Sequence, residues 1–125
     1  MKDINKVNAV LDRIATNINF YVIDKNGNLL YRHGGHYPRR NQLHDTRFPV
    51  PGTGEFDWQG IRPGSESPSV LNPKTNYLVN WNNRPARGWA SPDMWWLTWG
   101  RGDRANILID EITAVEALTP EQSWD

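Results

Sequence analysis

Three asparagines around one tryptophan form the first group of side chains in this sequence that could serve chemistry. Asn80-Trp81-Asn82-Asn83 follows a short apolar segment, so the carboxamides would emerge where a strand ends. One interpretation is a polar turn, in which the asparagine side chains cap the local backbone. The other is that one amide N–H is held as a donor for the oxyanion of an acyl-transfer transition state, which typically contributes about 3–4 kcal/mol. These four residues alone leave both interpretations open.

Histidines suggest a second kind of chemistry, metal binding. His33 and His36 stand three positions apart on a glycine-rich stretch, and His44 and Asp45 follow. Zinc sites are usually built from cysteine and histidine ligands at characteristic spacings, and the sequence has no cysteine. The pattern is therefore a weak match to a zinc site.

Tryptophans form the third group. Trp95-Trp96 and Trp99 lie close together in a chain that has seven tryptophans in all. If exposed, such a cluster could stack against a sugar. Tryptophan buries a large area and needs one partner for its N–H, so a place in the core is the more common role. A non-catalytic, Trp-rich binding module for carbohydrate or a protein partner is nevertheless the alternative to an enzyme.

Composition lowers the expectation for several classes of protein. Lysine plus arginine number 14, as do aspartate plus glutamate, so no net charge attracts nucleic acid or an anionic membrane surface. The absence of cysteine excludes disulfides and thiolate catalysis. No apolar run reaches the roughly 20 residues of a membrane span, and no apolar stretch typical of a signal peptide follows the first charges. The cellular location stays unknown from the sequence.

Hydrophobic spacing predicts the elements that would position these side chains. Over residues 3–17, apolar residues recur every three or four positions, which is typical of an amphipathic helix. These residues are Ile4, Val7, Leu11 and Ile14. Ile18–Asp24 and Leu29–Tyr31 are rich in β-branched and aromatic side chains, and Asn26-Gly27 between them is a strong hairpin signal.

A long loop region and two further elements follow the hairpin. Residues 34–76 are rich in Pro, Gly, Asn and Ser, with short extended pieces at Phe48–Pro51 and Phe56–Ile61, which predicts an ordered loop region. Loops of this length are uncommon in compact domains and often build a site. Tyr77–Trp81 is predicted to be a strand, and Arg104–Val115 a helix.

The last residues carry the signature of a helix start. Thr119-Pro120-Glu121-Gln122 combines an N-cap threonine, a proline at the first helical position and a glutamine that can close a capping box. Only three residues follow. We expect that this helix belongs to a longer chain, because isolated short helices are unstable.

Taken in order, several motifs resemble a single family. They are Asp24-Lys25-Asn26-Gly27-Asn28, His33-Gly34-Gly35-His36-Tyr37-Pro38, the stretch 45–58, Leu71–Tyr77, Asn80–Pro85 and Trp99–Arg104. The series is similar to the penicillin acylase (penicillin amidase) branch of the N-terminal-nucleophile hydrolases, which includes acylases of cephalosporins and of acyl-homoserine lactones. The resemblance runs in register from about Ile18 onward and matches the β-chain of these enzymes.

The resemblance implies an α+β fold, with residues 1–125 as a single partial domain. That domain would be a fragment of the αββα sandwich of the family, with a β-hairpin, a long irregular loop region and flanking helices. In the family one precursor is cut into an α-chain and a β-chain, and the N-terminal serine of the β-chain attacks the amide with its own α-amino group as base. The implied reaction converts an N-acyl amide into a carboxylic acid and an amine, with no cofactor for the chemistry.

The resemblance also implies roles for five residues. Asn82 would be the side-chain donor of the oxyanion hole, and Arg104 would orient that asparagine. Ile18 would line the pocket for the acyl group. Asp93 would bind a structural calcium ion through its carboxylate, and Thr46 would reach the same ion through its backbone carbonyl.

The nucleophile of the family has no counterpart in this sequence. Met1 cannot act as the N-terminal serine, and the internal serines lack a free α-amino group. We therefore expect an internal β-chain segment, from a partial, split or decayed gene, that is inactive and marginally stable alone. The small-molecule N-acyl amide is the substrate of the complete enzyme, and assembly with the remaining α- and β-chain pieces is a separate hypothesis.

Overall fold

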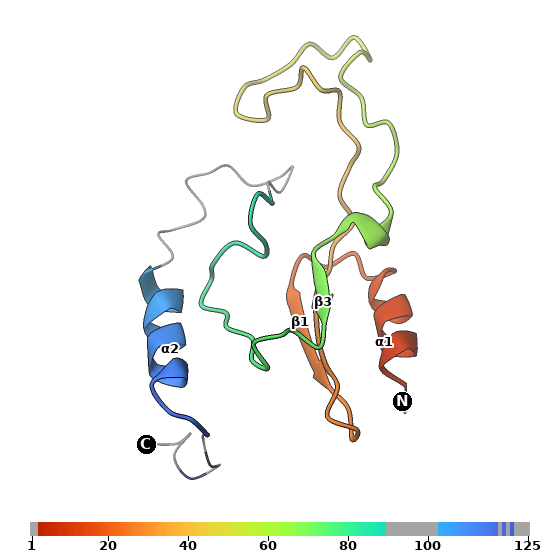
Figure 1. Cartoon of the computed structure of the whole chain (residues 1–125). Coiled ribbons are helices and arrows are strands. Elements are labelled where there is room, and N and C mark those ends of the chain that lie inside the picture. The colour runs from red at the N-terminus through yellow and green to blue at the C-terminus, as the bar shows by residue number, and fades with distance from the viewer. Residues whose placement is uncertain (1–2, 90–102, 118, 120, 122–125) are drawn as a thin grey trace.

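A computed structural model shows a small α+β fold, as the sequence predicts (Figure 1). It describes residues 3–89, 103–117, 119 and 121. The elements are the α-helices α1 (Ile4–Leu11) and α2 (Asp103–Thr113), the strands β1 (Asn19–Ile23), β2 (Leu29–His33) and β3 (Ser69–Leu71), and the 3₁₀ helix η1 (Gly64–Glu66). None of the helices described is long and apolar enough to cross a bilayer.

Helix α1 forms because its first turn is capped and one face is apolar. The Asp3 carboxylate accepts a hydrogen bond from the backbone N–H of Asn5, which satisfies a donor that the helix itself leaves free. Ile4 and Leu11 are buried, and the other two residues of the predicted apolar face pack against them. The helix is shorter than predicted, because the backbone N–H groups of Arg13 and Ile14 bond carbonyls three residues back.

Strands β1 and β2 form the predicted antiparallel hairpin, with Asn19 opposite His33 and Ile23 opposite Leu29. The Asp24 carboxylate accepts hydrogen bonds from the backbone N–H groups of Asn26 and Asn28. Gly27 has a φ of 79°, a backbone conformation that glycine adopts without steric cost. The Asp24–Asn28 connection therefore sets the register of the hairpin.

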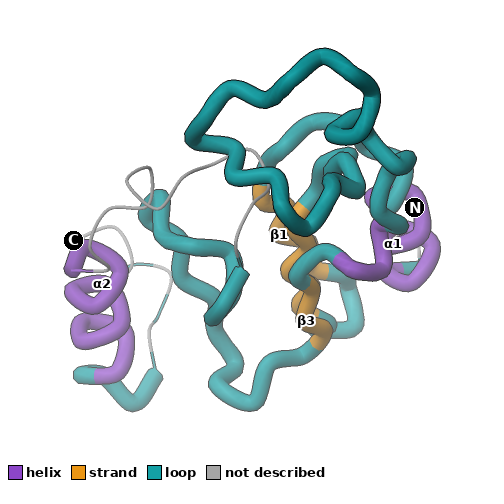
Figure 2. Tube along the Cα trace, turned by 90° about the horizontal axis from the view of Figure 1, so that it is seen from above, coloured by secondary structure: helices purple, strands orange, loops and turns teal. Residues whose placement is uncertain are grey.

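Strand β3 was not predicted from the sequence. It pairs antiparallel with β2, so the strand order is β1-β2-β3 and β2 is central. Leu30 in β2 is only 1% exposed and forms the core with Ile4 and Leu11 of α1. Helix α1 thus covers one face of the sheet (Figure 2).

The segment between β2 and η1 is a projecting loop, as predicted (Figure 1). Its stem is antiparallel, with hydrogen bonds from Arg39 N to Gly60 O (2.8 Å) and from Arg62 N to Tyr37 O (2.8 Å). Within this loop, the pieces Phe48–Pro51 and Phe56–Ile61 form no regular strand, and Ile61 makes an isolated antiparallel bridge with Pro38.

Of two predictions for the C-terminal part, the helix is confirmed and the strand is wrong. Helix α2 agrees with the predicted Arg104–Val115 within two residues at its end. Tyr77–Trp81 is not a strand, because no neighbouring strand in the part of the chain described pairs with it. The segment 72–89 lies between the sheet and α2 (Figures 1 and 2). The helix start predicted at Thr119 lies largely outside the described residues.

Candidate functional site

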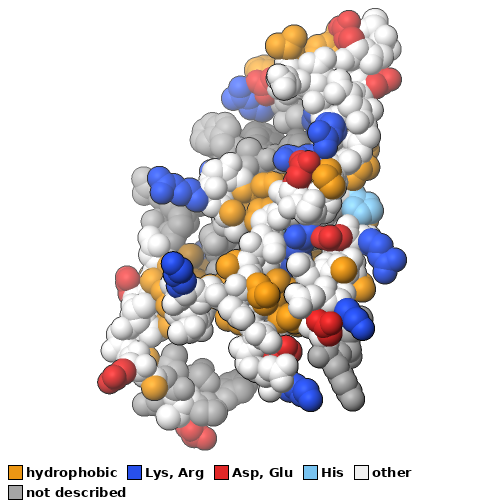
Figure 3. All heavy atoms as spheres, turned by 45° about the vertical axis from the view of Figure 1, so that its right-hand side comes forward, with side chains coloured by type: hydrophobic (Ala, Val, Ile, Leu, Met, Phe, Trp, Pro, Cys, Tyr) orange, Lys and Arg blue, Asp and Glu red, His pale blue; other side chains and the backbone are white. Residues whose placement is uncertain are grey.

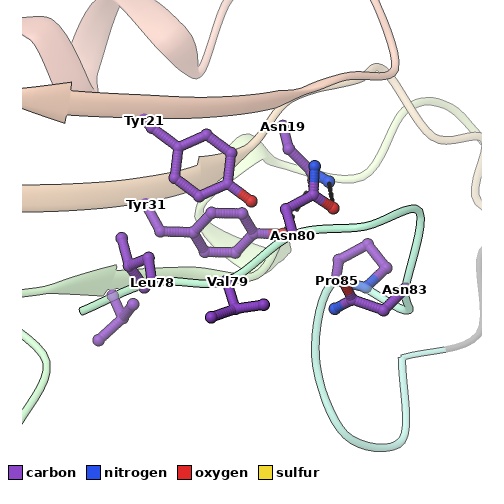
Figure 4. Close-up of a pocket in the computed structure, with 9 residues that line it drawn as sticks. Asn19, Tyr21, Tyr31, Leu78, Val79, Asn80, Asn83 and Pro85 are labelled. Atoms are coloured by element: carbon purple, nitrogen blue, oxygen red, sulfur yellow. Dashed lines mark hydrogen bonds between the residues drawn. The ribbon is translucent and has the colours of Figure 1, made fainter. Parts of the chain in front are cut away.

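A small cavity opens between the sheet and the segment that precedes the asparagine-rich turn (Figure 4). Its volume is about 140 Å³. The lining residues are Asn19, Tyr21, Tyr31, Val70, Leu78, Val79, Asn80, Asn83 and Pro85. Tyr21 and Tyr31 are cross-strand partners with ring centroids 5.4 Å apart. Because side chains alternate along a strand, these rings lie on the sheet face opposite Leu30 and α1.

Asn19 is the hub of a hydrogen-bond network beside this cavity. Its Oδ1 lies 2.9 Å from the hydroxyl of Tyr31 and 2.7 Å from Nδ1 of His33. On its other side, Nδ2 of Asn19 donates to Oδ1 of Asn80 at 3.5 Å. The network thus links residues on β1, β2 and the turn, which are far apart in the sequence.

His33 anchors the network in the interior. It is 3% exposed, and its Nε2 lies 2.6 Å from the hydroxyl of Tyr37. The ring of Trp89 packs nearly perpendicular to both rings, with centroid distances of 5.8 Å to His33 and 5.5 Å to Tyr37. Burial, and then the charge of Arg32, lower the pKa of His33, so the neutral imidazole is favoured. With both ring nitrogens engaged, His33 is not available as a metal ligand.

The asparagine-rich turn holds Asn82 in an unusual backbone conformation. Asn82 has a φ of 57°, which asparagine tolerates better than most residues, and its side chain is exposed. The Asn83 carboxamide accepts a hydrogen bond from Trp81 N at 2.8 Å. The guanidinium of Arg104 in α2 lies 5.2 Å from the centroid of the Trp81 ring. The structure therefore places Arg104 beside the turn that carries Asn82.

The other predicted site residues are spread over the chain. Ile18 is 44% exposed and lies directly before β1. Thr46 is exposed on the projecting loop. Its neighbour Asp45 is paired with Arg47 at 2.6 Å, and this contact lowers the pKa of Asp45 to about 2. Asp93 and the Trp95-Trp96-Trp99 cluster lie outside the described residues, within which no three metal-binding side chains come together.

Sequence reasoning missed the network around Asn19 and His33. The signal that could have found half of it is the alternation along the hairpin, which puts Asn19 and His33 on the same face as Tyr21 and Tyr31. The contact with Asn80 spans 61 positions, and no local pattern predicts it.

Comparisons with known proteins identify the family to which the chain belongs. Residues 1–125 match the sequence model of the penicillin amidase family. The chain is similar to penicillin G acylase from Escherichia coli, with 42% identity over 111 residues, which cover 89% of this chain and 13% of that protein. It also resembles the solved structure of a thermostable penicillin G acylase from Alcaligenes faecalis in orthorhombic form. That match has a TM-score of 0.87 and 31% identity, and covers 99% of this chain and 22% of the other. The chain thus spans less than a quarter of either relative.

Proposed function

The chain belongs to the penicillin amidase family, and we propose that it is an internal β-chain segment of an enzyme that hydrolyses N-acyl amides. The products are a carboxylic acid and an amine. The sheet described here is then part of the αββα core of an N-terminal-nucleophile hydrolase. The observation that carries the proposal is the match to penicillin G acylase along nearly the whole chain.

Asn82 supplies one donor of the oxyanion hole in this proposal. Asn82 is exposed, and it stands in the turn with a positive φ of 57°. A carboxamide N–H that meets the tetrahedral oxyanion lowers the barrier by about 3–4 kcal/mol. Arg104 supports this donor by packing on Trp81, the residue that precedes Asn82. A positive charge beside the turn also favours negative charge on the reacting oxygen.

The nucleophile in this proposal is the N-terminal serine of the complete β-chain. Within the described residues, no serine hydroxyl is hydrogen-bonded to a histidine ring, so no local base is in place to activate Ser65, Ser67 or Ser69. The segment therefore contributes transition-state stabilisation, and another part of the enzyme carries out the attack on the amide.

An assay of the purified chain tests this division of roles. We expect no release of chromophore from a phenylacetyl or longer acyl anilide above a heat-treated control. Co-expression with a family β-chain that lacks the matching segment, followed by pull-down, is expected to restore hydrolysis. Turnover by the 125-residue chain alone would contradict the proposal that its nucleophile lies elsewhere.

Three further residues have proposed roles in the complete enzyme. Ile18 contributes an apolar side chain to the pocket for the acyl group, which fits its exposure beside β1. Asp93 and the backbone carbonyl of Thr46 contribute oxygen ligands to a structural calcium ion, which prefers such oxygens. Thr46 is exposed on the projecting loop, which is compatible with contact to an ion that other parts of the enzyme also bind.

The described tryptophans do not favour the alternative, a Trp-rich binding module. Arg40 lies 5.4 Å from the centroid of the Trp58 ring, and Arg104 is placed similarly over Trp81. A guanidinium therefore covers one face of each exposed ring, which reduces the surface open to a sugar. Binding of the chain to an oligosaccharide, measured by calorimetry, would support the alternative.

A further inference from the structure

The network beneath the asparagine-rich turn has no role in the function proposed so far. We propose that Asn19 and His33 are positioning residues that hold the Asn80–Asn83 turn, and with it the carboxamide of Asn82. The link is the hydrogen bond from Asn19 Nδ2 to Asn80 Oδ1. The restraint of the turn by Asn19 does not depend on the proposed function. Its importance for catalysis rests on the proposed role of Asn82.

The partners of Asn19 fix the direction of its carboxamide. Tyr31 is 7% exposed, and its hydroxyl proton needs an acceptor. Asn19 Oδ1 accepts this proton and, from the same side, the N–H at Nδ1 of His33. A carboxamide that presents its oxygen to two donors must present its NH₂ group to the opposite side. That side faces Oδ1 of Asn80 (Figure 4).

His33 is itself held on its other side. Because Nδ1 carries the proton in the neutral ring, Nε2 accepts a hydrogen bond from the hydroxyl of Tyr37. The Tyr37 hydroxyl is also within hydrogen-bonding distance of Oδ1 of Asn17, at 2.9 Å, and of the carbonyl of Gly34, at 3.3 Å. The ring of Trp89 packs nearly perpendicular to the two stacked rings. Protonation of Nε2 would reverse only the bond to Tyr37, so the bonds from His33 to Asn19 and onward to Asn80 are kept in both charge states.

The effect on Asn82 passes through a turn of four residues. Asn80 is held at the start by Asn19, and Trp81 N is held by the side chain of Asn83. Between these two restraints, Asn82 keeps its positive φ. Loss of the first restraint gives Asn80 more freedom and allows the Asn82 carboxamide to leave the direction that an oxyanion requires. Misplacement of a catalytic donor by a fraction of an ångström lowers the rate.

The test is NMR spectroscopy of the full chain with two substitutions. Asn19→Asp keeps an acceptor for Tyr31 and His33 but removes the donor to Asn80. We expect it to shift the side-chain amide of Asn80 and the backbone amides of Trp81 and Asn82, and to raise the pKa of His33, which then faces a carboxylate. His33→Phe is expected to shift the resonances of the same amides. In His33→Gln, which retains a donor, most of these resonances are expected to lie where they do in the unsubstituted chain.

Asn72→Asp is the matched control. Asn72 also accepts from one partner, Leu29 N, and donates to another, Asn28 Oδ1, but at the other end of β2. Its substitution is expected to leave the amides of Asn80 to Asn82 unchanged. The proposal is overturned if Asn19→Asp shifts these amides no more than Asn72→Asp does. Should His33→Phe fail to fold, the near-isosteric Asn19→Asp decides the question.

Kinetics separate this proposal from the proposed function. In the complete enzyme, Asn19→Asp is expected to lower kcat several-fold and to leave KM unchanged. If substitution at Asn82 also has no effect on kcat, the proposed function fails, whereas the NMR result still decides whether Asn19 holds the turn.

Discussion

His33 is the titratable residue whose surroundings have the clearest consequence for stability. Its pKa in the folded chain is lowered, first by burial and then by Arg32. In the unfolded chain a histidine titrates near about 6.5. The unfolded state therefore binds more protons than the folded state between the two values. The free energy of unfolding is expected to be highest above about pH 6.5 and to decrease as the pH falls toward the pKa of the folded state.

Urea unfolding over a pH series measures this effect. His33→Gln is expected to flatten the dependence between about pH 6.5 and the lower, folded-state pKa, because glutamine does not titrate. His36→Gln is the control, since His36 is exposed, and it is expected to keep the slope of the unsubstituted chain. An unchanged slope in His33→Gln would show that burial of this imidazole does not control the pH dependence.

Elements α1, β2 and η1 meet at the side chain of Arg32. Arg32 of β2 is 4% exposed, and its Nη2 donates both to the carboxylate of Asp12, which ends α1, and to the carbonyl of Gly64 in η1. This one guanidinium therefore ties together three elements that are remote in sequence. Removal of one partner from a buried ion pair destabilises the fold more than removal of one partner from an exposed pair.

Asp12→Asn tests the importance of this tie. The substitution leaves the buried guanidinium without a carboxylate, and we expect a loss of about 1–3 kcal/mol of unfolding free energy. Asp45→Asn removes the same group from the exposed pair with Arg47 and is expected to change stability little. Thermal or urea unfolding of the two variants makes the comparison. Equal losses would mean that burial of Arg32 adds nothing to the pair.

Elements with a complete local signal were predicted from the sequence. The capped amphipathic helix α1, the hairpin around Gly27 and helix α2 each carry their pattern within a few residues. Strand β3 has only three residues, too few for an alternation to be recognised. Tyr77–Trp81 has strand-forming residues but finds no strand to pair with in the described part of the chain. Pairing depends on a partner, and a local pattern does not contain the partner.

In the candidate site, too, local patterns do not reveal which residues meet through the fold. Asn82 and Arg104 could be proposed from the sequence because their motifs resemble the family. The support from Asn19 could not, because Asn19 and Asn80 meet only through the fold.

The whole molecule has a small core for its length. The buried cluster consists of Ile4, Leu11 and Leu30, with a few partly buried neighbours. Many large apolar side chains lie at the surface instead, as Figure 3 shows for one side of the molecule. Ile23 is 74% exposed and Leu43 is 85% exposed. A segment of a larger protein is expected to expose apolar side chains where it contacts the other parts of that protein. This agrees with the small share of each relative that the chain spans.

Leu30→Ala tests how far the fold depends on this core. The truncation of a fully buried leucine is expected to cost about 2–5 kcal/mol, which is a large share of the stability of any small domain. We therefore expect loss of the cooperative transition in circular dichroism. Leu43→Ala is the control and is expected to have no effect. A Leu30→Ala variant that melts like the unsubstituted chain would show that this cluster is not the core.

In the complete enzyme, the chain is proposed to supply a donor of the oxyanion hole. The direct measurement is kcat of Escherichia coli penicillin G acylase in which the matching 111 residues are replaced by those of this chain. Asn82→Gly removes the carboxamide but keeps the positive φ that glycine tolerates. Asn76→Gly is the matched control, since Asn76 is also exposed and has a φ of 59°. We predict that Asn82→Gly lowers kcat by about 10²–10³-fold while Asn76→Gly leaves it unchanged; equal kcat values for the two variants would contradict the claim.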